Sequence, residues 1–122
     1  MSPTFISDCI STESSQFHDL TPYSSSRLIH AAFGMQTETA EFTDALKKAI
    51  FYGKPLDTVN LKEELGDLLW YIAIAMDELG TDFTAESTRV VNKLKLRYLN
   101  GFTTSDALDR NLAAERALLE NQ

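Results

Sequence analysis

The chain has 122 residues, of which 43% are hydrophobic and 24% are charged, a balance typical of one globular domain spanning residues 1–122. Its net charge of -7 argues against a nucleic-acid-binding surface, which would need a basic face. The single cysteine, Cys9, excludes an intrachain disulfide and a thiolate zinc site, and the longest apolar run, residues 68–76, is too short to cross a bilayer. Because a secretory signal pattern is also lacking, we expect a cytoplasmic protein with no membrane partner.

The first 26 residues are rich in serine and threonine and are the hardest part of the chain to assign. Apolar residues at largely helical spacing predict a weak amphipathic helix there: Phe5, Ile6, Cys9, Ile10 and Phe17. A loop containing Pro22 follows, and the serines at 24–26 are suitable N-caps for the next helix.

A long helix is predicted from Arg27 to about Tyr52. Its apolar stripe advances in steps of three and four, as in a helix packed in a bundle: Leu28, Ala32, Met35, Thr39, Phe42, Leu46 and Ala49. Gly53 is the expected C-cap, and Pro55 prevents the helix from continuing.

Three further helices are expected after this point. Asn60 is predicted to open the first of them, with Glu63 completing a capping box, and Gly80 to end it. Its stripe is Leu61, Leu65, Leu68, Ile72, Ala75 and Leu79. Asp82 is expected to cap a helix over 83–98, and Thr104 or Ser105 a last helix whose shared face holds Leu108, Leu112, Glu115 and Leu119. With no alternating strand pattern, the predicted fold class is all-α, a small helical bundle.

Two acidic pairs lie beside the predicted packing stripes. Glu38 and Glu41 are three residues apart on one helix, and Glu64 and Asp67 repeat that spacing on the next. Such a spacing puts both carboxylates of a pair on one face, roughly 4.5 Å apart along the axis. Ala31, Gly34 and Ala45 extend the first acidic strip with small residues, and Gly66 stands beside Asp67, which leaves room around the carboxylates.

Two interpretations of these pairs remain open from spacing alone. One Glu-x-x-Glu pair in an acidic helical protein is usually a solvated face. Asp67, however, lies in an apolar run with no Lys or Arg between Lys62 and Arg89, so it needs a compensating charge. Two facing pairs would form a cage for a hard cation, and oxygen donors without nearby His or Cys favour Mg²⁺ or Mn²⁺ over zinc.

Several segments resemble the MazG-like nucleoside triphosphate pyrophosphohydrolases, an all-α superfamily marked by E-x-x-E, a spacer and E-x-x-D. Here the first motif ends at Glu41, a spacer of 22 residues covers 42–63, and the second motif begins at Glu64. Residues 27–41 and 64–71 carry the main resemblance, and residues 52–56, 92–98 and 110–116 add to it. The similarity therefore spans about 27–116 and leaves the N-terminal segment 1–26 weakly covered.

The resemblance implies hydrolysis of (deoxy)nucleoside triphosphates between the α and β phosphorus, giving a monophosphate and pyrophosphate. Carried over by motif position, the residues that would hold Mg²⁺ are Glu38, Glu41, Glu64 and Asp67. Bound cations would offset the repulsion between a triphosphate and a chain of charge -7. Glu38 or Glu41 is the expected proton acceptor for the attacking water, that is, the catalytic base.

Candidate substrate-binding residues are His30, Lys54, Tyr71, Asn92, Lys95 and Arg97. Asn92 and Lys95 share a helix face and match the family's substrate-binding pattern, while Arg97 belongs to the same basic stretch, which equally suits a solvated face. Tyr71 is positioned to stack on a base or to pack in the core. His30 and Lys54 are as readily explained as ordinary surface or core residues.

The run from Leu65 to Met76 is apolar on nearly all sides, so we expect a homodimer or homotetramer to cover it. Two alternatives to a general triphosphate pyrophosphohydrolase stay open. One is an enzyme like the phosphoribosyl-ATP pyrophosphohydrolases, which share the acidic motif. The other is a non-catalytic, metal-stabilised helical oligomer or regulatory protein.

Overall fold

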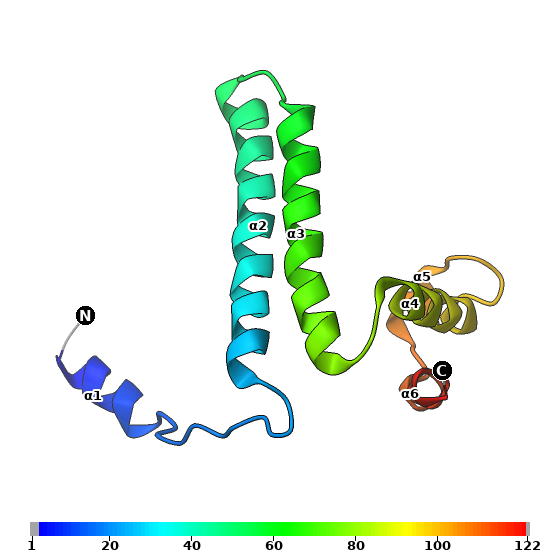
Figure 1. The fold of residues 1–122 in the computed structure, drawn as a ribbon, viewed down its shortest axis with the longest axis horizontal. Coiled ribbons are helices and arrows are strands. Elements are labelled where there is room, and N and C mark those ends of the chain that lie inside the picture. Colours follow the sequence, from blue (N-terminus) through cyan, green and yellow to red (C-terminus); the bar gives the residue numbers. More distant parts are fainter. Residues whose placement is uncertain (1–2, 122) are drawn as a thin grey trace.

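The computed structural model describes residues 3–121, so Met1, Ser2 and Gln122 of the predicted domain lie outside it. The described residues form helices and no strand, which confirms the all-α class (Figure 1). The helices are α1 (Pro3–Ser11), α2 (Ser25–Tyr52), α3 (Thr58–Leu79), α4 (Phe83–Arg97), α5 (Thr104–Leu108) and α6 (Leu112–Glu120).

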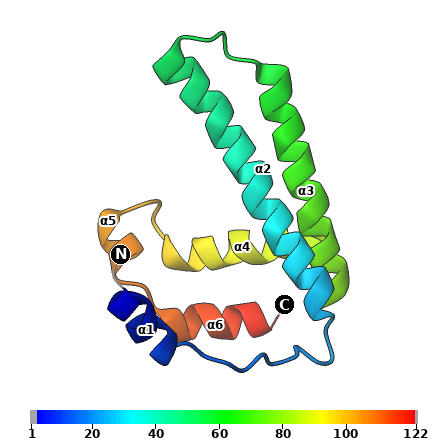
Figure 2. The ribbon, with the colours of Figure 1, turned by 90° about the vertical axis from the view of Figure 1, so that its left-hand side faces the viewer.

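A long antiparallel hairpin of α2 and α3 dominates the fold, and the two helices lie side by side in both views (Figures 1 and 2). α2 begins after Ser24, whose hydroxyl oxygen accepts a hydrogen bond from the Arg27 N–H at 3.3 Å. It ends at Gly53, which adopts φ 67°, a left-handed conformation favoured by glycine. Both limits agree with the serine cap and glycine stop expected from the sequence.

α3 begins earlier than predicted. The N-cap is Asp57, whose carboxylate accepts a hydrogen bond from the Asn60 N–H at 3.0 Å. Asn60 is therefore already inside the first turn, and the expected capping box at Asn60 and Glu63 is wrong. An N-cap aspartate satisfies a free N–H of the first turn directly, so the residue nearer to Pro55 starts the helix. Gly80, at φ 71°, ends α3 as predicted.

The α2–α3 interface is displaced from the predicted stripes. On α2 it is centred on Ala31 and Gly34, both buried, whereas Ala32 and Thr39 of the predicted stripe are exposed. On α3 the buried residue is Glu64, while Leu65 remains 49% exposed. The strip of small and acidic residues thus faces the neighbouring helix, and the apolar stripes flank it.

After α4, the chain forms two helices, α5 and α6, where one was predicted. Asp82 caps α4 as expected, its carboxylate accepting from the Ala85 N–H at 2.8 Å. After α5 the chain breaks at 109–111, and the Asn111 side chain caps α6 by accepting from the Ala114 N–H at 3.1 Å. Asn side chains compete with helical hydrogen bonds and favour caps, which explains the break. Leu108 consequently does not share a helical face with Glu115.

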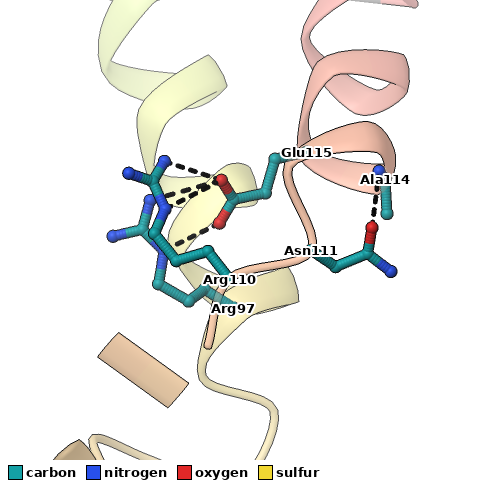
Figure 3. A network of polar contacts seen from close by, with 5 residues as sticks. All are labelled: Arg97, Arg110, Asn111, Ala114 and Glu115. Carbon is teal, nitrogen blue, oxygen red and sulfur yellow. Dashed lines mark hydrogen bonds and ion pairs between the residues drawn. The ribbon is translucent and has the colours of Figure 1, made fainter. Parts of the chain in front are cut away.

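A buried ion cluster joins α4 to α6 (Figure 3). Glu115 is only 3% exposed, and its carboxylate accepts from Arg97 Nε and from Arg110 Nη2, each at 2.7 Å. The hydrogen bond from Arg97, then that from Arg110, holds the pKa of Glu115 at about 2 against the opposing effect of lost hydration. These three residues form the α4–α6 clasp.

The helices enclose little apolar volume within one chain. α4 leaves the foot of the hairpin and packs along α6, and in the view of Figure 1 α1 lies to the left of the hairpin while α4 and α6 lie to its right. Among the described residues, Ala31 is the one apolar side chain that is buried. No helix in the described part of the chain has the length and apolar character needed to cross a bilayer.

Candidate metal centre

Three carboxylates meet between the two helices of the hairpin. Glu38 and Glu41 come from the middle of α2 and Glu64 from the second turn of α3, and one oxygen of each lies within 4.8 Å of the others. Glu64 is 7% exposed and Glu38 is half-buried, whereas Glu41 reaches the surface. We call these three residues the carboxylate cluster.

The cluster has unsatisfied oxygens. Glu38 Oε2 and Glu64 Oε2 are buried, and neither has a hydrogen-bond partner among the described residues. A buried carboxylate oxygen without a donor is costly unless a proton or a cation compensates it. Because the two helices hold these two carboxylates close together, the arrangement favours binding of a positive charge.

The electrostatics of Glu64 point the same way. The hydrogen bond with Glu38, in which the two carboxyl groups share a proton, has the largest effect on the pKa of Glu64 and raises it. Burial, a hydrogen bond to Glu41 and repulsion from both neighbours also raise this pKa, which reaches about 7. Near pH 7 Glu64 therefore holds a proton about half of the time, and below that pH the proton takes the place of a third negative charge. A divalent cation would replace that proton.

The donor set fits a hard divalent cation. All three groups are carboxylates, and neither His nor Cys joins them in the part of the chain that the structure describes. Oxygen-only sites suit Mg²⁺, Mn²⁺ or Ca²⁺ better than zinc. Glu38, Glu41 and Glu64 are the residues positioned to hold such an ion.

Asp67 lies apart from the carboxylate cluster. It is exposed, one turn further along α3 than Glu64. It lines a pocket of about 270 Å³ together with Glu38, Trp70 and Tyr71. The structure thus brings three of the four predicted ligands together and connects the fourth to them through Glu38.

Aromatic rings line this pocket, which is formed by Glu38, Asp67, Trp70 and Tyr71 and which we call the aromatic pocket. The Tyr71 ring meets the His30 ring edge-on with centroids 5.7 Å apart, and the Trp70 ring with centroids 5.0 Å apart. Gly34 lies directly against Tyr71, where a Cβ would overlap the ring. The small residue on α2 therefore accommodates a tyrosine of α3, and the expectation that Gly34 leaves room around the carboxylates is corrected.

A second pocket, of about 290 Å³, lies on the other side of the cluster, toward the turn between α2 and α3. Glu41 and Glu64 form one wall, and Lys54, a predicted substrate contact, is on another. Sequence reasoning missed its further lining residues, Lys48 and Asn60. Lys48 is seven residues after Glu41, a spacing that returns to the same helix face and was available as a signal.

The predicted contacts on α4 are not near the cluster in one chain. α3 ends about four turns after Glu64, a rise of roughly 22 Å, before α4 begins. α4, which carries Asn92 and the exposed Lys95, then packs on α6 and not along the hairpin (Figure 2). Arg97 is held in the α4–α6 clasp, where it shares the single carboxylate of Glu115 with Arg110.

Comparison with known proteins identifies one family. The model of the MazG nucleotide pyrophosphohydrolase domain matches residues 31–102, well over half of the chain. The match includes all three residues of the carboxylate cluster and Asp67. No curated protein and no solved structure matches the chain.

Proposed function

The chain belongs to the MazG nucleotide pyrophosphohydrolase family, and we propose that it hydrolyses nucleoside triphosphates to a monophosphate and pyrophosphate with Mg²⁺ as cofactor. The observation that carries this proposal is the carboxylate cluster, in which Glu38 and Glu64 each have a buried oxygen with no partner in the described chain. A protein that bound a cation only at its exposed surface would not require buried carboxylates of this kind.

The proposed metal ligands are Glu38, Glu41, Glu64 and Asp67. When bound, Mg²⁺ would neutralise phosphate charge and lower the pKa of water near it. Glu41 is our preferred base, because it is the exposed member of the cluster and so can take a proton from water and pass it to solvent. The water oxygen forms a bond to the α-phosphorus, the bond from that phosphorus to the α–β bridging oxygen breaks, and pyrophosphate leaves.

The aromatic pocket is the proposed site of the base. Tyr71 and Trp70 present flat rings beside Glu38, with His30 against Tyr71, and stacking on such rings accepts any nucleobase. Tyr71 is half-buried and fixed by its contact with Gly34, so we assign stacking to Trp70, which is 59% exposed, and positioning to Tyr71.

We propose that Asn92 and Lys95 act from a second copy of the chain. Within one chain α4 does not pack along the hairpin, whereas an oligomer would bring the α4 helices of other copies to uncovered faces. A homodimer or homotetramer would also cover exposed apolar residues such as Phe33 and Phe51.

Product analysis over a panel of ribo- and deoxynucleoside triphosphates, with Mg²⁺ and with a chelator, tests the proposal. We expect monophosphate and pyrophosphate in equal amounts, no turnover with chelator, and a fall of about 100-fold or more in kcat for Glu41→Gln. Glu63→Gln is the matched control, because Glu63 is exposed and lies outside the cluster.

The same assay separates the alternatives. Release of diphosphate and phosphate from the panel contradicts the proposed cleavage position. With phosphoribosyl-ATP added to the panel, turnover of this compound alone identifies the related specialised enzyme. If no substrate reacts and Glu41→Gln changes only assembly or stability, the chain is a non-catalytic helical oligomer.

A further inference from the structure

The carboxylate cluster separates two pockets of different chemistry. The aromatic pocket toward the foot of the hairpin is lined by Glu38, Asp67, Trp70 and Tyr71, with no cationic side chain among its described residues. The pocket toward the α2–α3 turn, which we call the lysine pocket, is lined by both Lys48 and Lys54. A substrate spanning the cluster would therefore meet aromatic groups at one end and ammonium groups at the other.

Lys54 is fixed at the rim of the lysine pocket by the end of α2. Its backbone N–H donates to the Lys48 carbonyl oxygen at 3.2 Å, and the Gly53 N–H donates to that same oxygen. These two hydrogen bonds to one carbonyl oxygen form a helix-capping arrangement that holds the turn in place. No carboxylate in the described chain lies within ion-pair distance of Lys54, so its charge is available to a ligand.

The other charges of the lysine pocket are already partly committed. Lys48 Nζ forms an ion pair with Asp44 at 2.7 Å, and Asp57 is occupied as the N-cap of α3. Glu64, nine-tenths buried with Oε2 unpartnered, forms the wall that the pocket shares with the cluster. The acidic residues that line the lysine pocket outnumber its lysines, so the pocket repels anions until cations occupy the carboxylate cluster.

We propose that the lysine pocket receives the pyrophosphate end of the triphosphate, with Lys54 and Lys48 as its cationic groups, so that the substrate lies along the hairpin with its base toward Trp70. This inference rests on the proposed function and assigns the direction of the substrate in that site. The departing pyrophosphate carries most of the negative charge of the products, so the side that carries the ammonium groups stabilises it best.

Calorimetric titration of pyrophosphate and of a nucleoside monophosphate into the full chain with Mn²⁺ tests the direction. We expect Lys54→Met to weaken pyrophosphate binding about tenfold or more, Lys48→Met to weaken it less because of Asp44, and both to bind the monophosphate within about twofold of wild type. Lys54→Arg should retain most of the affinity. Lys47→Met is the matched control, since Lys47 neighbours Lys48 but faces the outer side of α2.

Three outcomes would overturn the inference: no metal-dependent pyrophosphate binding by wild type, undiminished binding by Lys54→Met, or an equal loss for the monophosphate. Melting temperatures of the variants check that folding is unchanged. Turnover distinguishes this failure from failure of the proposed function. A wild type that releases pyrophosphate while Lys54→Met keeps its KM and pyrophosphate affinity refutes only the direction, whereas a wild type without turnover refutes the function itself.

Discussion

Glu64 shows how one residue joins folding to chemistry. Packing between α2 and α3 buries it, and the neighbouring Glu38 and Glu41 raise its pKa to about 7. An apolar residue of similar size would suit the interface better in terms of hydration. Under the proposed function, the acid is kept for binding a cation, at the expense of stability in the metal-free chain.

The close contact between Gly34 and Tyr71 predicts how a substitution at Gly34 changes stability. A Cβ there would overlap the Tyr71 ring, so Gly34→Ala should lower the free energy of unfolding by about 1–3 kcal/mol and displace that ring. Gly66→Ala is the matched variant: nothing lies within 4 Å of the added atom, and alanine should stabilise the helix by about 0.5–1 kcal/mol. Urea unfolding measures both changes. Equal effects of the two substitutions would refute the close Gly34–Tyr71 contact.

Individual site residues were predictable where chemistry depended on local spacing. The positions of Glu38, Glu41 and Glu64 on facing helices followed from their three-residue spacing and their place beside apolar stripes. The role of Gly34 did not, because it depends on Tyr71, which is distant in sequence. The ion pair of Arg97 with Glu115 was not foreseen, because nothing near Arg97 in sequence indicates that Glu115 lies opposite, and its role as a phosphate contact stays a prediction.

At the scale of the element, helix ends with a glycine stop or an aspartate cap were found correctly at Gly53, Gly80 and Asp82. The start of α3 was not, since Asp57 and Asn60 are both suitable caps and only the backbone conformation decides between them. The break before α6 was missed because the apolar spacing continues through Asn111.

Asp57 gives the prediction for α3. Asp57→Ala removes the cap and should lower the free energy of unfolding by about 1 kcal/mol, whereas Asn60→Ala should lower it by less than half as much. Thermal or urea unfolding distinguishes the two variants. A larger loss for Asn60→Ala would restore the start of α3 that the sequence predicted.

The α4–α6 clasp predicts a particular acid sensitivity. The pKa of Glu115 is about 2 in the fold and near 4.5 when unfolded, so its contribution to stability is complete above pH 4.5 and is lost as the pH falls toward 2. Glu115→Gln should lower the melting temperature at neutral pH and flatten the acid loss below pH 4.5. Glu120→Gln, in the exposed pair with Arg116, should do neither. Equal acid profiles for the two variants would contradict the clasp.

At the scale of the whole molecule, the described chain buries one apolar side chain, Ala31, and leaves Phe33 65% and Phe51 77% exposed. We expect this surface to be covered in a homodimer or homotetramer, because so large an apolar exposure is unusual in a monomer. Sedimentation equilibrium should give at least twice the mass of the chain, and the melting temperature should rise with protein concentration. A monomer with a concentration-independent melting temperature would contradict this.

Fold class and helix order could be inferred for the whole molecule from periodicity, since local spacing determines both. The stacking of the helices could not. Among the described residues, the apolar stripes beside Ala31 and Gly34 are only partly covered, and a sequence does not state whether a stripe faces a neighbouring helix or a second copy.

The most direct test of the account is whether the carboxylate cluster binds a divalent cation. Calorimetric titration of Mn²⁺ at about pH 6 and about pH 8 should show tighter binding at the higher pH, because the proton held by Glu64 up to about pH 7 competes with the metal. Glu64→Gln should abolish the binding, and Glu63→Gln should leave it unchanged. Binding of Mn²⁺ by Glu64→Gln with the affinity of wild type, or no binding by wild type at either pH, would contradict the account.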